Sequence, residues 1–190
     1  MTEIEIRGKL TKEEFYKLEY FLEKTTKLKD TYKRLSVDLS PGFDPETRSW
    51  KQSKFDLRLK KSGNSEKISL KVGEFHLKER EEIEVKIKEG EFLDALKLLE
   101  TLGFNKGMIY FWESWEYEYQ DFEVKISKYS DSYYTWEIES DDPVKDPNEL
   151  AKTLSLKPYT EEEYKKAIDW ENQNVHKLYT LELVDKLLKE

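Results

Sequence analysis

The chain has 190 residues, a length that suits one domain with its own hydrophobic core. Its net charge is −8 and its pI is near 5.1, whereas proteins that bind duplex nucleic acid usually carry an excess of Lys and Arg. Cysteine is absent, which excludes disulfides and Cys-ligated zinc, and no stretch approaches the roughly 20 apolar residues that cross a bilayer. We therefore predict a single cytoplasmic domain over residues 1–190 that binds neither nucleic acid nor membrane.

The first elements expected along the chain are a strand and a helix. Residues 3–7 alternate charged side chains with isoleucine, which is the period of a strand with two different faces. Thr11 and Glu14 have the spacing of a capping box, and apolar residues then recur at helical spacing to about Lys24. Residues 40–53 contain two prolines and a glycine, which indicates a loop or a long hairpin connection.

Three alternating segments follow, and each is expected to form a strand with one charged and one apolar face. They are residues 55–60, 67–72 and 80–87. A second amphipathic helix is expected over residues 91–102, with Gly103 as its C-terminal stop. Two strands around a turn are expected within residues 108–126, and another strand over residues 135–139. The remainder, residues 143–190, is expected to be a C-terminal helical segment, in which Thr160 caps a longer helix.

The charged faces of these strands carry both acidic and basic residues. On a half-exposed antiparallel sheet such a face is the one in contact with water. The two helices, however, require an apolar sheet surface, and the opposite face is the only candidate. The apolar residues of that face are Ile4, Ile6, Leu57, Leu59, Ile83, Val85 and Ile87. If this face lies outside, under the helices, and the sheet closes, the charged face becomes the lining of a barrel.

A charged lining is costly unless the charges pair or a ligand compensates them. A triphosphate with Mg²⁺ or Mn²⁺ meets this need, because Arg and Lys complement phosphate oxygens and carboxylates hold hard cations. Five charged elements occur in the same order as in the CYTH, or triphosphate tunnel metalloenzyme, superfamily, which this sequence resembles. In chain order they are Glu3-x-Glu5-x-Arg7, Arg58-x-Lys60, Lys71, Arg80-x-Glu82-x-Glu84 and Glu137-x-Glu139. The first is similar to the ExExK signature of the family, with Arg in place of Lys.

The resemblance spans nearly the whole chain and implies an α+β fold. The implied architecture is a closed or nearly closed antiparallel eight-stranded β-barrel, the triphosphate tunnel, with amphipathic helices packed outside. The residues implied to contact phosphate are Arg7, Arg58, Lys60, Lys71 and Arg80. The residues implied to hold Mg²⁺ or Mn²⁺ are Glu3, Glu5, Glu82, Glu84, Glu137 and Glu139, and Glu3 and Glu5 are also the implied catalytic pair.

The second half of the chain departs from the family pattern. Counting back without gaps from Glu137, Trp112 and Ser114 stand where the family carries a Lys-x-Arg pair. Ser127 stands where the family carries an aspartate. Two implied phosphate-binding cations and one carboxylate are therefore replaced.

Three functions agree with these residues. The first is a metal-dependent phosphohydrolase that cleaves inorganic tripolyphosphate or a small organic triphosphate, such as thiamine triphosphate or a nucleotide. The second is a class IV type adenylyl cyclase, and the third is a catalytically degenerate phosphate-binding or interaction module. The protein is expected to be a monomer or a homodimer.

Two further features carry expectations of their own. Aromatic residues are frequent between residues 110 and 136, and we interpret them as packing on the barrel exterior or at a dimer interface. The alternative is that they stack on a ring of the ligand at the tunnel mouth. His176 has no neighbouring His or Asp at metal-ligand spacing, and it is expected at the surface.

Overall fold

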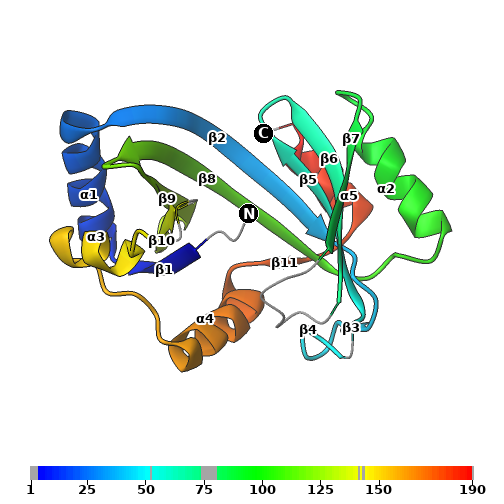
Figure 1. Cartoon of the computed structure of the whole chain (residues 1–190). Coiled ribbons are helices and arrows are strands. Elements are labelled where there is room, and N and C mark those ends of the chain that lie inside the picture. Colours follow the sequence, from blue (N-terminus) through cyan, green and yellow to red (C-terminus); the bar gives the residue numbers. More distant parts are fainter. Residues whose placement is uncertain (1–3, 52, 74–80, 141, 143, 190) are drawn as a thin grey trace. The chain divides into compact units, whose positions relative to one another are not determined.

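The computed structural model describes residues 4–51, 53–73, 81–140, 142 and 144–189. These residues form an α+β structure with five helices and a large antiparallel sheet (Figure 1). The chain divides into two compact units. Unit 1 comprises residues 1–32 and 112–168, and unit 2 comprises residues 33–111 and 169–190. The prediction of a single domain over residues 1–190 stays a prediction.

The strands of unit 1 follow the order β1-β10-β9-β8, and the first part of β2 lies next to β8. The bounds are Ile4–Leu10 for β1, Tyr133–Ser140 for β10, Phe122–Ser130 for β9, Met108–Tyr119 for β8 and Lys27–Asp38 for β2. Gln120 and Asp121 connect β8 to β9 with positive φ angles of 51° and 62°. Two consecutive residues with positive φ suit a tight hairpin, and this connection confirms the turn predicted there.

Two helices cover the apolar face of unit 1, α1 (Lys12–Thr25) and α3 (Pro147–Thr153). The predicted capping box is present: the Thr11 Oγ1 accepts from the Glu14 backbone N–H at 3.2 Å, and the Glu14 Oε2 accepts from the Thr11 N–H at 2.8 Å. The helix buries Phe15, Leu18 and Leu22 against the sheet. Their partners on the sheet are largely aromatic and β-branched: Tyr117, Val124, Ile126, Tyr134, Trp136 and Ile138. These aromatic residues pack in the core between sheet and helices, and their position on the exterior of a closed barrel stays a prediction.

In unit 2 the sheet continues from β2 through β5 and β6 to β7, which is the last strand in this order. The bounds are Phe55–Ser62 for β5, Ser65–Val72 for β6 and Glu81–Ile87 for β7. The short strand β11 (Lys177–Leu178) pairs with the start of β8. Helices α2 (Phe92–Thr101) and α5 (Leu181–Leu187) pack on the apolar face. The core joins Leu35, Val37, Leu57 and Leu59 of the strands to Phe92, Leu96, Leu99 and Val184 of the helices.

The fourth helix, α4 (Glu161–Asn174), begins in unit 1 and ends in unit 2. Thr160 and Glu163 form its predicted capping box, because each accepts a hydrogen bond from the backbone N–H of the other. Among the residues described, no helix combines the length and the apolar character needed to cross a membrane.

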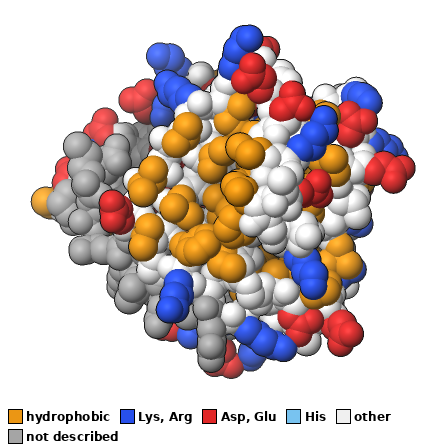
Figure 2. Space-filling model, turned by 90° about the vertical axis from the view of Figure 1, so that its right-hand side faces the viewer, with side chains coloured by type: hydrophobic (Ala, Val, Ile, Leu, Met, Phe, Trp, Pro, Cys, Tyr) orange, Lys and Arg blue, Asp and Glu red, His pale blue; other side chains and the backbone are white. Residues whose placement is uncertain are grey.

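Several expectations differ from the structure. Strand β2 was not predicted, whereas the small hairpin of β3 (Phe43–Asp44) and β4 (Ser49–Trp50) agrees with the hairpin connection expected within residues 40–53. Ile83 and Val85 were expected beneath helices but are 46% and 55% exposed, because β7 ends the sheet and is exposed along nearly its whole length. Figure 2 shows apolar side chains gathered on the side of the molecule that lies to the right in Figure 1. His176, expected at the surface, is buried at 5% exposure.

Candidate functional site

The strand register gathers charged side chains on one face of each unit. In unit 1, Arg7 lies opposite Glu137, which lies opposite Lys125, and Lys125 lies opposite Glu116. On this face the acidic side chains are Glu5, Glu116, Glu118, Glu123, Glu137 and Glu139, and the basic ones are Arg7, Lys9 and Lys125. Because successive side chains of a strand point to opposite faces, the aromatic core lies on the other side. We call this surface the acidic face.

Arg7 is held in place by groups from three elements. Its Nε lies 3.5 Å from Glu5 and its Nη1 lies 3.7 Å from Glu137. Its Nη2 donates to the hydroxyl of Tyr164 on α4 at 2.5 Å, and the guanidinium lies 4.5 Å from the centre of that ring. Two predicted carboxylates and one predicted cation therefore meet here, together with a tyrosine that the sequence did not single out.

Lys125 links two further carboxylates of the acidic face. Its Nζ lies 2.8 Å from Glu139 and 2.7 Å from Glu123. Burial raises the pKa of Glu139 to about 7, and the charges of Glu137 and Glu5 add to this rise, whereas Lys125 opposes it. Burial is the main cause of this rise, and the neighbouring carboxylates are secondary to it. Lys29 of β2 contributes a second cation, which bonds to Glu123 and lies 2.9 Å from Glu116.

A pocket of about 400 Å³ in unit 1 adjoins these carboxylates. It is lined by Lys29, Tyr117, Glu118, Asp121, Phe122, Glu123, Glu139, Ser140 and Asp142. The walls are predominantly acidic, and they include the turn between β8 and β9.

The oxygen donors of the acidic face are of the type that Mg²⁺ and Mn²⁺ prefer. In this arrangement, however, Lys125 bridges Glu139 and Glu123. Within the described residues, no three His, Cys, Asp or Glu side chains are grouped so that they could hold a metal ion. The donor chemistry fits a divalent cation, but the positions of the side chains fit internal ion pairs.

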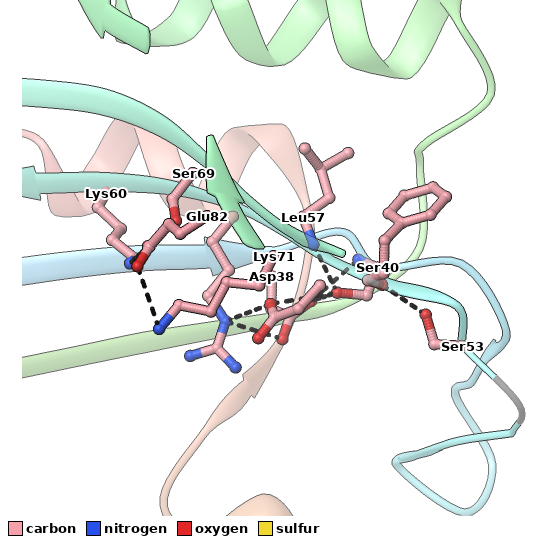
Figure 3. A network of polar contacts seen from close by, with 11 residues as sticks. Asp38, Ser40, Ser53, Leu57, Lys60, Ser69, Lys71 and Glu82 are labelled. Atoms are coloured by element: carbon pink, nitrogen blue, oxygen red, sulfur yellow. Dashed lines mark hydrogen bonds and ion pairs between the residues drawn. The ribbon is translucent and has the colours of Figure 1, made fainter. Parts of the chain in front are cut away.

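Unit 2 presents a second charged face with a different balance. The basic side chains that the register places there are Arg34, Arg58, Lys60, Lys67, Lys71 and Lys86, and the acidic ones are Asp38, Asp56, Glu82 and Glu84. Three residues of this basic face meet around one carboxylate: Glu82 accepts from Ser69 at 2.7 Å and lies 3.6 Å from Lys60 and 3.4 Å from Lys71 (Figure 3). Burial lowers the pKa of Lys60, and the positive charges of Arg58, Lys71 and Lys67 add to this effect. The negative charge of Glu82 opposes it.

Arg58 lies beside two buried aspartates. Its Nε donates to Asp56 at 2.7 Å and lies 3.4 Å from Asp38. Tyr110 of β8 also lies near, with its ring centre 5.8 Å from the guanidinium carbon. Burial raises the pKa of Asp38, and the charge of Asp56 adds to this rise. The positive charge of Arg58 opposes it.

The predicted site residues therefore divide between the units. Unit 1 brings together Glu5, Arg7, Glu137 and Glu139, and unit 2 brings together Arg58, Lys60, Lys71 and Glu82. Glu84 pairs instead with Lys67 at 2.6 Å. Glu3 and Arg80 lie outside the described residues.

Sequence reasoning missed the contributions of β2 to both faces, namely Lys29 and Asp38. The signal for Asp38 was present in residues 35–38, where Leu and Val alternate with Ser and Asp before the proline-rich segment. No comparable alternation marks Lys29, whose neighbours are nearly all polar.

Ser114, Ser127 and Trp112, where the sequence resemblance implied charged residues, contact uncharged side chains. Ser114 and Ser127 lie opposite one another in the register, are both buried, and share a hydrogen bond of 2.8 Å. Trp112 stacks on Tyr129, with ring centres 5.4 Å apart. The hydroxyls of Ser114 and Ser127 therefore satisfy each other, at positions where the sequence resemblance implied a cation and a carboxylate.

No protein-family model matches the sequence, and neither does any curated protein. Solved structures do match. A candidate adenylate cyclase from Bacillus halodurans is 16% identical with a TM-score of 0.55, over 84% of this chain and 95% of that one. A candidate adenylyl cyclase from Hippeastrum, described as having a dominant triphosphatase activity, is 16% identical with a TM-score of 0.55, over 95% of this chain and 99% of that one.

The chain has a CYTH-like fold. A chain of the Mediator head module of Schizosaccharomyces pombe is also similar, at 15% identity and a TM-score of 0.51, over 82% of this chain and 95% of that one. Identities this low show the fold alone, and a fold hosts more than one function. The function of the CYTH-like chain must therefore be argued from its charged faces.

Proposed function

We propose that the chain binds a triphosphate together with a divalent cation, Mg²⁺ or Mn²⁺, and hydrolyses it. The observation that carries the proposal is the separation of charge in a CYTH-like fold, with an acidic face in unit 1 and a basic face in unit 2. The proposal includes the closed or nearly closed barrel expected from the sequence. Inorganic tripolyphosphate, thiamine triphosphate and nucleotides are the substrates to test.

The basic face supports phosphate binding. Arg58, Lys60 and Lys71 lie on adjacent strands of one sheet, where they would complement the oxygens of a phosphate chain. Glu82 lies between the two lysines and keeps them oriented in the absence of a ligand. Phosphate binding by Arg7, which lies in unit 1, stays a separate prediction.

The acidic face supports cation binding. Glu5, Glu137 and Glu139 would hold the cation, and its charge would favour the ionised form of Glu139, whose pKa is raised mainly by burial. When bound, a divalent cation neutralises phosphate charge and lowers the pKa of a coordinated water. Lys125 now occupies part of this surface, so a cation must compete with it for Glu139.

The decisive experiment is phosphate release from tripolyphosphate, thiamine triphosphate and ATP, each with Mg²⁺, with Mn²⁺ and with EDTA. The double variant Glu137→Gln/Glu139→Gln should lose metal-dependent turnover. Glu161→Gln/Glu162→Gln is the matched control, since it removes the same charge from the exposed first turn of α4. Conversion of ATP to cyclic AMP and pyrophosphate would support the adenylyl cyclase instead.

The neutral pair of Ser114 and Ser127, with the likeness to a chain of the Mediator head module, favours a second candidate, a phosphate-binding or interaction module without turnover. A thermal shift assay separates the candidates, because a ligand that binds the folded state raises Tm by mass action. Stabilisation by tripolyphosphate without phosphate release would indicate the module. No stabilisation by any triphosphate would reject phosphate binding altogether.

A further inference from the structure

Asp38 and Asp56 are buried acidic residues on the basic face of unit 2. Their exposures are 0% and 3%, and they lie on the neighbouring strands β2 and β5. Both carboxylates lie closest to the Nε of the same cation, Arg58: its N–H donates to Asp56 at 2.7 Å, and Asp38 is an ion-pair neighbour at 3.4 Å without a hydrogen bond to it. Two buried carboxylates for one guanidinium are more negative charge than neutralisation of that group requires, and burying charge is costly.

Asp38 is itself held rigidly. Its Oδ1 accepts from the backbone N–H of Ser40 at 2.9 Å and from the Ser40 hydroxyl at 2.5 Å. That hydroxyl in turn accepts from the backbone N–H of Leu57 at 2.9 Å, and Figure 3 shows the three residues in one network. The carboxylate of Asp38 is thus tied to two strands before any contact with Arg58 is counted.

Because the two carboxylates lie at the Nε of Arg58, the terminal nitrogens of the guanidinium can still bind an anion. Nε carries one N–H, whereas the two terminal nitrogens carry four, and phosphate is bound best by two parallel N–H groups. The carboxylate contacts leave the terminal nitrogens to the surface of the basic face, where the Arg58 side chain is 34% exposed. An arginine held in this way needs to give up less side-chain freedom when it binds an anion.

We propose that Asp38 and Asp56 are positioning residues that hold Arg58 by its Nε and present its terminal nitrogens to a phosphate on the basic face. The inference rests on the proposed function for the identity of the anion. It makes a prediction opposite to simple electrostatics, since removing a nearby negative charge would by itself strengthen phosphate binding.

A double-mutant cycle on the full-length protein tests this. The variants are Asp56→Asn, Arg58→Lys and the two combined, and the probe is tripolyphosphate with Mg²⁺ in isothermal titration calorimetry. Asp56→Asn should weaken binding about tenfold, because one long side chain must then be immobilised on binding. In the Arg58→Lys background the same change should alter affinity by less than about twofold, because lysine has no fork to orient.

A second readout does not need the ligand. The Nε–H of Arg58 should give a slowly exchanging NMR signal in the wild type, and this signal should be lost in Asp56→Asn. Asp44→Asn is the matched control, because Asp44 is ion-paired to Lys51 at 2.7 Å in the hairpin of the same unit. If Asp56→Asn does not fold, Asp38→Asn gives the same test with a smaller expected loss of about threefold.

The outcomes separate the inference from the proposed function. A wild type that binds no tripolyphosphate refutes the proposed function and the inference with it. A wild type that binds, while Asp56→Asn binds equally well or more tightly, refutes the inference alone. Equal weakening by Asp56→Asn in both backgrounds also refutes it, because the aspartate then acts on stability and not through Arg58.

Discussion

The two units use the same construction for different chemistry. In each, alternating strands place charged residues on one face and a hydrophobic core on the other, with amphipathic helices over the core. The charged face of unit 1 is rich in glutamate, whereas that of unit 2 is rich in lysine and arginine. The two-residue period of a strand therefore determines which face of the sheet carries the charged side chains. The residue types on that face determine whether it suits a cation or an anion.

The cores differ as well. Unit 1 buries Trp136, Tyr117, Tyr134 and Phe15, whereas the core of unit 2 consists mainly of leucine and valine. Phe15 lies 4.8 Å from Tyr134 and 5.6 Å from Trp115 between ring centres, within the range in which aromatic pairs attract one another. We therefore expect a core substitution to act mainly on the unit that carries it.

The largest expected effect is on stability. Leu22→Ala in unit 1 and Leu96→Ala in unit 2 each empty a fully buried position, which should lower the free energy of unfolding by about 2–5 kcal/mol. Hydrogen exchange measured by mass spectrometry should quicken mainly in the unit that carries the substitution. The same increase in both units for either variant would show that the cores unfold as one.

The next effect concerns the basic face. Lys60→Gln/Lys71→Gln should weaken tripolyphosphate binding by at least about 100-fold, since each of the two lost charge-assisted hydrogen bonds is worth roughly 1.5–3 kcal/mol. Lys165→Gln/Lys166→Gln on the exposed surface of α4 is the control with the same change in charge. Comparable weakening by the control would mean that only net charge matters, and the contrast between the faces would be lost.

The acidic face should respond to pH. The pKa of Glu139 is raised from 4.5 to about 7, so the folded state holds this proton between those values while the unfolded state releases it. The group therefore makes folding less favourable as pH rises through this window. Glu139→Gln should reduce the loss of stability between pH 5 and pH 8 in urea unfolding.

A divalent cation should also change the pKa of Glu139. Mg²⁺ bound at the acidic face would favour the charged carboxylate, so an NMR titration of Glu139 should show a lower pKa with Mg²⁺ than with EDTA. An identical titration curve in both conditions would exclude this carboxylate as a ligand.

The smallest effect is expected at Arg7. Tyr164→Phe removes the hydroxyl that accepts from Arg7 but keeps the ring beneath the guanidinium. The free energy of unfolding should fall by about 0.5–1.5 kcal/mol. Tyr164→Ala should cost more, because it also removes the cation–π contact; equal effects of the two variants would show that the ring contributes nothing.

Much of this architecture is local in origin and was therefore readable from the sequence. The alternation in residues 55–60 predicts which side chains share a face, because the period of a strand is two whatever surrounds it. The capping boxes at Thr11 and Thr160 depend on groups three residues apart, and both are present. The order of charged motifs was sufficient for the CYTH-like fold.

Only the tertiary structure decided features that depend on distant neighbours. Strand β2 begins with mostly polar residues that carry no local signal, and its strand conformation there depends on the neighbouring strand β8, while residues 34–38 pair with β5. The exposure of Ile83 follows from the place of β7 at the end of the sheet, and the burial of His176 follows from its packing against Tyr110 at 4.2 Å between ring centres. The pairing of Arg58 with Asp38 joins residues 20 positions apart in sequence, and register, not periodicity, brings them together.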